Sequence, residues 1–205
     1  GGLHRTVAAL IRRGSNIDQK RRGGAGGTAL MEAASAGEEE VVRTLAAAGA
    51  DVDRGDDNGD TPLIIASAFG HAAVVSALAA AGADVELAEN HGDTPLFVAV
   101  LNSSAKNRGH TLAVQALLEA GADVNRPIGD GMTPLVQAVR DGNEGAVSVL
   151  LLAGADPNQA ARPTLGLRPP IPGPEPIDIL LGTDRLWQTI DITPLGEAQK
   201  GSHTT

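Results

Sequence analysis

The 205-residue chain contains no cysteine and no tyrosine, and its other aromatic residues are two phenylalanines and one tryptophan. Without cysteine it can form neither a disulfide framework nor a thiolate metal site. Because bulky aromatic side chains are so scarce, small residues must fill much of the core, and runs of alanine occur at 46–48 and 79–81. A core of this kind requires closely packed helices.

An excess of basic charge, long apolar runs and clustered histidines are also missing. The formal net charge of -9 opposes contact with phosphate backbones, so we expect no nucleic-acid partner. No apolar stretch reaches the roughly 18 residues of a membrane span, and the start of the chain does not read as a signal peptide. The five histidines lack the spacing of metal ligands. These absences predict an intracellular protein, cytoplasmic with a nuclear location open, that uses no membrane, metal or cofactor.

Two short motifs recur at a common interval. Thr-Pro-Leu begins at Thr61, Thr94 and Thr133, and a Thr-Ala-Leu variant begins at Thr28, so that successive copies are 33, 33 and 39 residues apart. Gly-Ala-Asp begins at positions 49, 82, 121 and 154, at intervals of 33, 39 and 33 residues. Because two independent motifs share one frame, the chain is built from internal repeats.

One copy of the repeat predicts two helices and a turn. Thr61 can cap a helix with its hydroxyl group, and Pro62 suits the first helical position. This helix is expected to end at Gly70, and apolar residues at helical spacing predict a second helix that ends at Gly82. The Gly- and Asp-rich segment 83–93 predicts a hairpin-like finger. Alanine recurs at one position of the first helices, where it would let neighbours pack closely: Ala33, Ala66, Ala99 and Ala138.

This 33-residue unit resembles the ankyrin repeat across residues 2–156. The resemblance implies an all-α helical repeat solenoid in which helix pairs are joined by β-hairpin-like fingers. One position departs from the family pattern: histidine usually follows Thr-Pro-Leu, and this chain has Ile64, Phe97 and Val136 there, with Met31 after Thr-Ala-Leu. The polar contact of that histidine is therefore not expected here.

The repeat frame divides the chain into three parts. Residues 1–156 form the array, whose first repeat is truncated on its N-terminal side, so we expect the chain to begin within a longer array. Residues 157–192 form a Pro-rich insertion or extended loop, since seven of the twelve prolines fall between 157 and 176. Residues 193–205 are either a partial last repeat or a tail. Six extra residues within 101–108 are expected in a loop between two helices.

The resemblance implies that a protein partner binds the concave face formed by the fingers and the first helices. We therefore expect a non-catalytic, monomeric scaffold; the alternative is a regulatory or targeting segment of a larger enzyme, channel or effector whose activity lies outside this chain. Carried over position by position, the concave face holds Asp57, Asn58, Asp60, Phe69, Asn90, His91, Asp93, Leu101, Asp130, Met132, Arg140 and Asp141.

The distribution of charged residues along the chain indicates which charge the partner is expected to carry. Residues 51–93 hold nine carboxylates and one arginine, whereas residues 1–28 hold six lysines or arginines and one aspartate. We predict that a basic segment of the partner lies over Asp57, Asp60 and Asp93. The alternative is that several of these carboxylates close turns through their own backbone and the others form a solvated surface.

Three shorter features allow more than one interpretation. Phe69 is either an aromatic anchor for the partner or a core residue that packs on the next repeat. The basic run 20–22 is either a solvated turn or a contact for an acidic partner. Residues 117–125 resemble the asparagine-hydroxylation pattern of some ankyrin repeats, which would make Asn125 a candidate for modification.

Overall fold

The computed structural model describes residues 16–21, 26–102, 108–129 and 131–159. The chain divides into two compact units, Gly1–Arg168 and Pro169–Thr205, and the second lies wholly outside the described residues. The N-terminal half-repeat and the segments 160–192 and 193–205 therefore stay predictions. Within the described ranges the chain forms eight helices and no strand.

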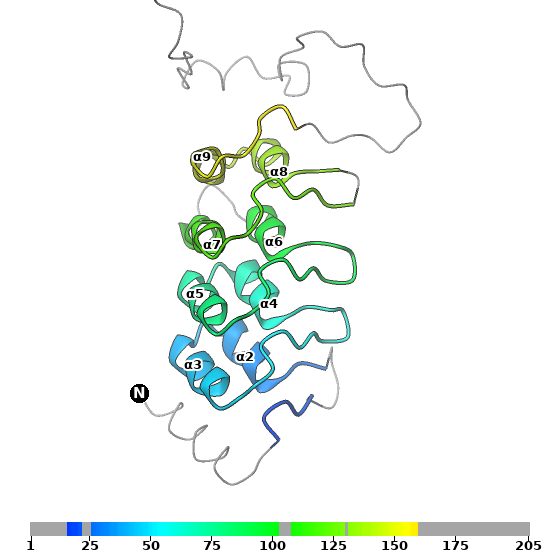
Figure 1. Ribbon diagram of the computed structural model, residues 1–205, viewed down its shortest axis with the longest axis vertical. Helices are drawn as coiled ribbons and strands as arrows, with labels where there is room; N and C mark the ends of the chain where they lie inside the picture. Colours follow the sequence, from blue (N-terminus) through cyan, green and yellow to red (C-terminus); the bar gives the residue numbers. More distant parts are fainter. Residues whose placement is uncertain (1–15, 22–25, 103–107, 130, 160–205) are drawn as a thin grey trace, which may run out of the picture. The chain divides into compact units, whose positions relative to one another are not determined.

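The helices occur in pairs, one pair to each repeat. The first helices are α2 (Ala29–Ser35), α4 (Pro62–Phe69), α6 (Pro95–Leu101) and α8 (Pro134–Arg140). The second helices are α3 (Glu39–Ala47), α5 (Ala72–Ala80), α7 (Arg108–Glu119) and α9 (Glu144–Leu152). Successive first helices contact one another, as do successive second helices, so the pairs stack into two layers (Figure 1). The helical repeat solenoid predicted from the sequence is confirmed.

Each first helix begins at the threonine of the repeat motif. The hydroxyl oxygens of Thr61, Thr94 and Thr133 accept hydrogen bonds of 3.2 to 3.3 Å from the backbone amide three residues later. At Thr28 this bond comes from the amide of Met31 at 3.4 Å, and the Thr28 amide donates in return to Sδ of Met31 at 3.2 Å. The residues that replace the family's histidine therefore complete the helix cap with their backbone amides. Met31 also uses its sulfur atom, and no imidazole takes part.

Small side chains fill the space between neighbouring first helices. Ala66, Ala99 and Ala138 are fully buried, as their recurrence in the sequence predicts. The larger core residues are mostly leucine and valine, and they join these alanines in one cluster that runs from Leu30 to Ala155. The apolar residues of each repeat are therefore buried partly against the next repeat, so stability depends on contacts between neighbours.

A histidine of the next repeat forms a hydrogen bond near the turn between the two helices of a repeat. Nε2 of His71 donates to the carbonyl oxygen of Ser35 at 3.0 Å, and Nε2 of His110 donates to that of Ala68 at 2.9 Å. This approach requires glycine at Gly70, which has a φ of +71° and whose added Cβ would lie 2.8 Å from the backbone nitrogen of His110. The extra residues of repeat three precede this contact and leave it intact.

A second set of hydrogen bonds joins the segments that follow the second helices. The backbone amides of Asp51, Asp84, Asp123 and Asp156 donate to side chains of the preceding repeat at 2.8 to 3.0 Å, and the acceptors are Asp18, Asp53, Glu86 and Asn125 respectively. Three carboxylates of this set therefore join neighbouring repeats, a role that the turn-closing alternative did not include. Modification of Asn125 stays a prediction.

Ala66→Asp should destabilise the array, because it buries a carboxylate without a partner between α4 and its neighbours. We expect Tm to fall by about 6 °C or more, corresponding to at least about 2 kcal/mol. Ala73→Asp on the exposed side of α5 is the matched control and should move Tm by less than about 2 °C. Thermal melts followed by circular dichroism compare the two, and equal curves would show that Ala66 is not internal.

Gly70→Ala and Gly142→Ala separate backbone strain from contact between repeats. Both glycines have positive φ, +71° and +66°, so alanine costs roughly 1–2 kcal/mol at either position. Only at Gly70 would the new Cβ meet backbone atoms of the next repeat; at Gly142 no heavy atom lies within 4 Å. We expect Gly70→Ala to lower Tm at least about twice as far. A larger loss for Gly142→Ala would be inconsistent with this packing.

Candidate functional site

A groove of about 500 Å³ opens between the fingers of repeats two and three and the first helices beside them. The fingers project on the side of α4 and α6, away from α5 and α7 (Figure 1). Helix α4 contributes four apolar side chains and α6 contributes one valine, while the charged groups of the lining belong to the two fingers. The residues that line this finger groove are Asn58, Asp60, Ile64, Ile65, Ala68, Phe69, Glu89, His91, Asp93 and Val98.

The two fingers are closed in the same way, each by a carboxylate at its start. In the finger of repeat two, Oδ1 of Asp56 accepts hydrogen bonds from the amides of Asn58 and Asp60 at 2.8 and 3.0 Å. In the next finger, Glu89 accepts from the amides two and four residues later at 2.9 and 3.1 Å. The carboxylates of Asp56 and Glu89 thus accept hydrogen bonds from the backbone of their own fingers, whereas Asp60 and Asp93 end the fingers and line the groove.

Neighbouring fingers also hold one another. The amide of Asn90 donates to the carbonyl oxygen of Asn58 at 3.1 Å, and its Nδ2 donates to that of Asp57 at 3.3 Å. Gly59 leaves room for this contact, since a Cβ there would lie 2.7 Å from Oδ1 of Asn90. Asn90, predicted to contact the partner, therefore fixes the spacing of the two fingers and is not part of the groove lining.

Asp57 faces the preceding finger. Its Oδ1 lies 3.2 Å from Nζ of Lys20, and the neighbouring Arg21 pairs with Glu32 at 3.3 Å. Asp57 is likewise absent from the groove lining. The basic run thus forms ion pairs within the chain, a role that neither alternative for it included; Arg22 lies outside the described residues.

Two of the groove's carboxyl groups are partly desolvated and lie near other negative charges. Burial raises the pKa of Asp60, and the charges of Asp56 and Glu89 raise it further. Burial and the charge of Glu89 likewise raise the pKa of Asp93. Partial desolvation beside like charges is unfavourable for both carboxylates, and such strain is concentrated at functional sites.

One imidazole offsets part of this negative charge. Nδ1 of His91 lies 2.7 Å from Oε2 of Glu89, and this hydrogen bond, with the charge of Glu89, raises the pKa of His91. Burial opposes ionisation of Glu89, but hydrogen bonds from the amides of His91 and Asp93 and from the His91 ring lower its pKa overall. The side chain of His91 is 85% exposed, so a ligand can reach it.

Phe69 is 56% exposed at the end of α4. Its ring stacks on His71, with centroids 6.0 Å apart and an angle of 17° between the planes. The interpretation of Phe69 as a core residue is therefore wrong, because its side chain lies in the groove lining and on the surface. Its role as an anchor for a partner stays a prediction.

The other predicted contacts lie away from the finger groove. Leu101 is exposed at the end of α6, and Arg140 and Asp141 are exposed at the end of α8. Met132 is half-buried in the finger of repeat four, and Asp130 lies outside the described residues. Of the predicted set, the structure thus brings five into one groove: Asn58, Asp60, Phe69, His91 and Asp93.

Glu89, Ile64, Ile65 and Val98 also line the groove but were not predicted from the sequence. Glu89 stands one repeat after Asp56, so the shared turn-closing position could have identified it. Ile65 and Val98 also share one repeat position, but both are apolar residues on helices whose sequences are largely apolar. The hydrophobic pattern therefore does not separate groove from core at that position.

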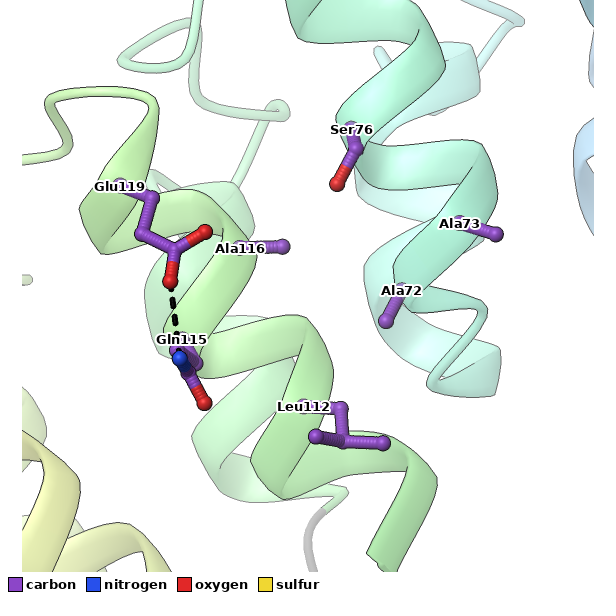
Figure 2. Close-up of a pocket in the computed structure, with 7 residues that line it drawn as sticks. All are labelled: Ala72, Ala73, Ser76, Leu112, Gln115, Ala116 and Glu119. Carbon is purple, nitrogen blue, oxygen red and sulfur yellow. Dashed lines mark hydrogen bonds between the residues drawn. The ribbon is translucent and has the colours of Figure 1, made fainter.

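A second, shallower hollow of about 250 Å³ lies between α5 and α7 (Figure 2). Leu112 projects from α7 and is 54% exposed, and Nε2 of Gln115 donates to Oε1 of Glu119 at 2.8 Å. The side chains that α5 contributes are alanines and one serine. This hollow therefore lacks the combination of aromatic surface and several charges found in the finger groove.

Two searches of the described residues gave no site of another kind. No group of three or more histidine, aspartate or glutamate side chains in the described ranges is placed to hold a metal ion. None of the helices in the described part of the chain is both long enough and apolar enough to cross a membrane.

The contact between His91 and Glu89 predicts a pKa for His91 above its usual 6.5, measurable by NMR titration. Because the folded state favours the imidazolium, this contact stabilises the protein fully below pH 6.5, and that contribution is lost as pH rises through the raised pKa. Glu89→Gln removes the charge, so the pKa of His91 should move back toward 6.5. An unchanged value in this variant would show that the two side chains do not interact.

Comparison with known proteins identifies the same repeats as the structure. A search of curated proteins finds no match for the sequence. The family model for ankyrin repeats matches three times, at residues 1–88, 56–128 and 88–161. These matches cover most of the chain, and they coincide with the repeat frame and the stacked helix pairs. The chain belongs to the ankyrin-repeat family.

Proposed function

We propose that this chain is a non-catalytic scaffold whose finger groove binds a basic segment of a partner protein. Ankyrin repeats are generally protein-interaction modules, which supports the general function. The observation that carries the specific proposal is the finger groove itself, where an exposed aromatic ring lies beside two partly desolvated carboxylates. Exposed aromatic side chains in a concave surface are typical anchors for a partner.

Charge complementarity favours a basic partner. Within the described ranges no lysine or arginine pairs with Asp60 or Asp93, whereas Lys20, Arg21 and Arg126 each pair with another carboxylate. A cation from a partner would lower the pKa of both groove carboxyls and offset the negative charge of Asp56 and Glu89 near them. The contribution of such contacts is expected mainly in association rate and orientation.

Phe69→Ala and Leu112→Ala give a matched test of which surface binds. The two side chains are nearly equally exposed, 56% and 54%, but Phe69 lies in the finger groove and Leu112 in the hollow between α5 and α7. A randomised peptide library displayed on phage is selected on the intact chain, and the enriched peptides are then tested on both variants. We expect basic peptides that bind the Leu112→Ala protein normally and the Phe69→Ala protein at least about tenfold more weakly.

Two results would contradict the proposal in different ways. Peptides that lose binding only with Leu112→Ala would place the interaction on the second helices. Enriched peptides that depend on Phe69 but carry no excess of lysine or arginine would support the groove and exclude a basic partner.

A further inference from the structure

His91 is the one cationic group that the structure places among the charges of the finger groove in its described residues. His91 lines the same groove as Asp60 and Asp93, and its charge offsets part of the rise that burial causes in the pKa of each carboxyl. This cation is present only while the ring is protonated. Because the ring is exposed and is held through its contact with Glu89, it can be displaced without disturbing the core.

We propose that the finger groove holds one arginine or lysine side chain of the partner, and that its charge takes the place of the His91 imidazolium opposite Asp60 and Asp93. This inference rests on the proposed function, since it specifies the chemistry that the same groove recognises. It adds a competition between an internal cation and the cation of the ligand.

The groove matches both ends of such a side chain. Arginine and lysine combine an apolar stem with a charged head. Ile65, Val98 and the ring of Phe69 offer apolar surface from the helices, while the carboxylates of Asp60 and Asp93 belong to the fingers. A cation close to an aromatic face gains additional stabilisation. A neutral apolar ligand would leave the two carboxylates without a counter-charge.

Among the residues that the structure describes, the charged groups that line the groove all belong to the fingers. Asp56 and Asp60 belong to the first of the two fingers, and Glu89, His91 and Asp93 belong to the second. Helices α4 and α6 carry no ionisable side chain. On the neighbouring elements, the ring of His71 stacks on Phe69 and that of His110 bonds the carbonyl of Ala68, so both contact α4.

Competition with His91 gives the binding a definite pH dependence. Deprotonation of the imidazolium removes the internal cation, so affinity for an external cation should rise as pH increases through the pKa of His91, above 6.5. Protonation of Asp60 and Asp93 should weaken binding further in acid, beginning above their usual 3.8. A simple surface ion pair would show neither the first effect nor its dependence on His91.

The test uses the intact ¹⁵N-labelled chain and three small probes: N-acetyl-arginine methylamide, N-acetyl-lysine methylamide and the neutral N-acetyl-citrulline methylamide. NMR titrations are recorded at pH 6.0 and pH 8.5. We expect saturable shifts at residues 58–60 and 89–93 with at least one cationic probe and none with citrulline. Affinity should be about fivefold higher at pH 8.5, the size expected when one exposed charge contact is gained.

Three variants identify the groups responsible. The double variant Asp60→Asn, Asp93→Asn should bind the cationic probe about tenfold more weakly. His91→Gln should bind at pH 6.0 about as tightly as the natural chain does at pH 8.5. Glu119→Gln, which neutralises one exposed carboxylate in the other hollow, is the control for loss of negative charge outside the groove and should leave affinity unchanged. Circular dichroism of each variant verifies that the helices are intact.

The proposal is overturned if citrulline binds as well as arginine, if Glu119→Gln weakens binding as much as the double variant, or if no probe binds. It is also overturned if the affinity of the His91→Gln protein keeps the full pH dependence. These results would overturn the inference about a single cation without deciding whether the groove binds a partner. In the display selection, peptides that require Phe69 would still establish the groove as a binding surface, even when no single cation enters it.

Discussion

The stacking of each helix pair on the next is the contact on which the rest of this structure depends. Small alanines such as Ala66 and Ala99 bring the first helices close, and leucines and valines of successive repeats share one core. Hydrogen bonds from His71 and His110 to carbonyl oxygens of the preceding repeat then fix the relative position of the pairs. Because the core is shared, a repeat gains its full stability only beside its neighbours.

The same stacking creates the candidate binding surface, since no single repeat contains the finger groove. Asp60 belongs to one repeat and Asp93 to the next, and the hydrogen bonds of Asn90 hold their fingers at a constant spacing. The carboxylates of Asp56 and Glu89 maintain the turns, so the backbone holds Asp60 and Asp93 at the finger ends despite the nearby negative charge. A bound cation would offset this unfavourable arrangement of partly desolvated carboxylates.

The periodic features of the fold could be predicted from the sequence. Thr61 and Pro62 indicate where a helix begins, Gly70 where it ends, and the recurrence of Ala66 which side faces a neighbour; the structure has all three. These signals are local or repeat at a fixed interval. Five members of the groove were also predicted: Asn58, Asp60, His91 and Asp93 because their place in the repeat puts them on the fingers, and Phe69 because it ends a first helix.

Contacts between different repeats could not be predicted in the same way. The direction of Asp57 toward Lys20 depends on how two fingers pack, and the sequence shows only that both charges are present. The exposure of Phe69 depends on the residues that α6 and the next finger place beside it. Hydrogen–deuterium exchange, with and without an enriched basic peptide, would show directly whether the finger groove binds the peptide. We expect slower exchange within residues 58–69 and 89–98 and no change within 112–119; protection confined to 112–119 would exclude binding in the groove.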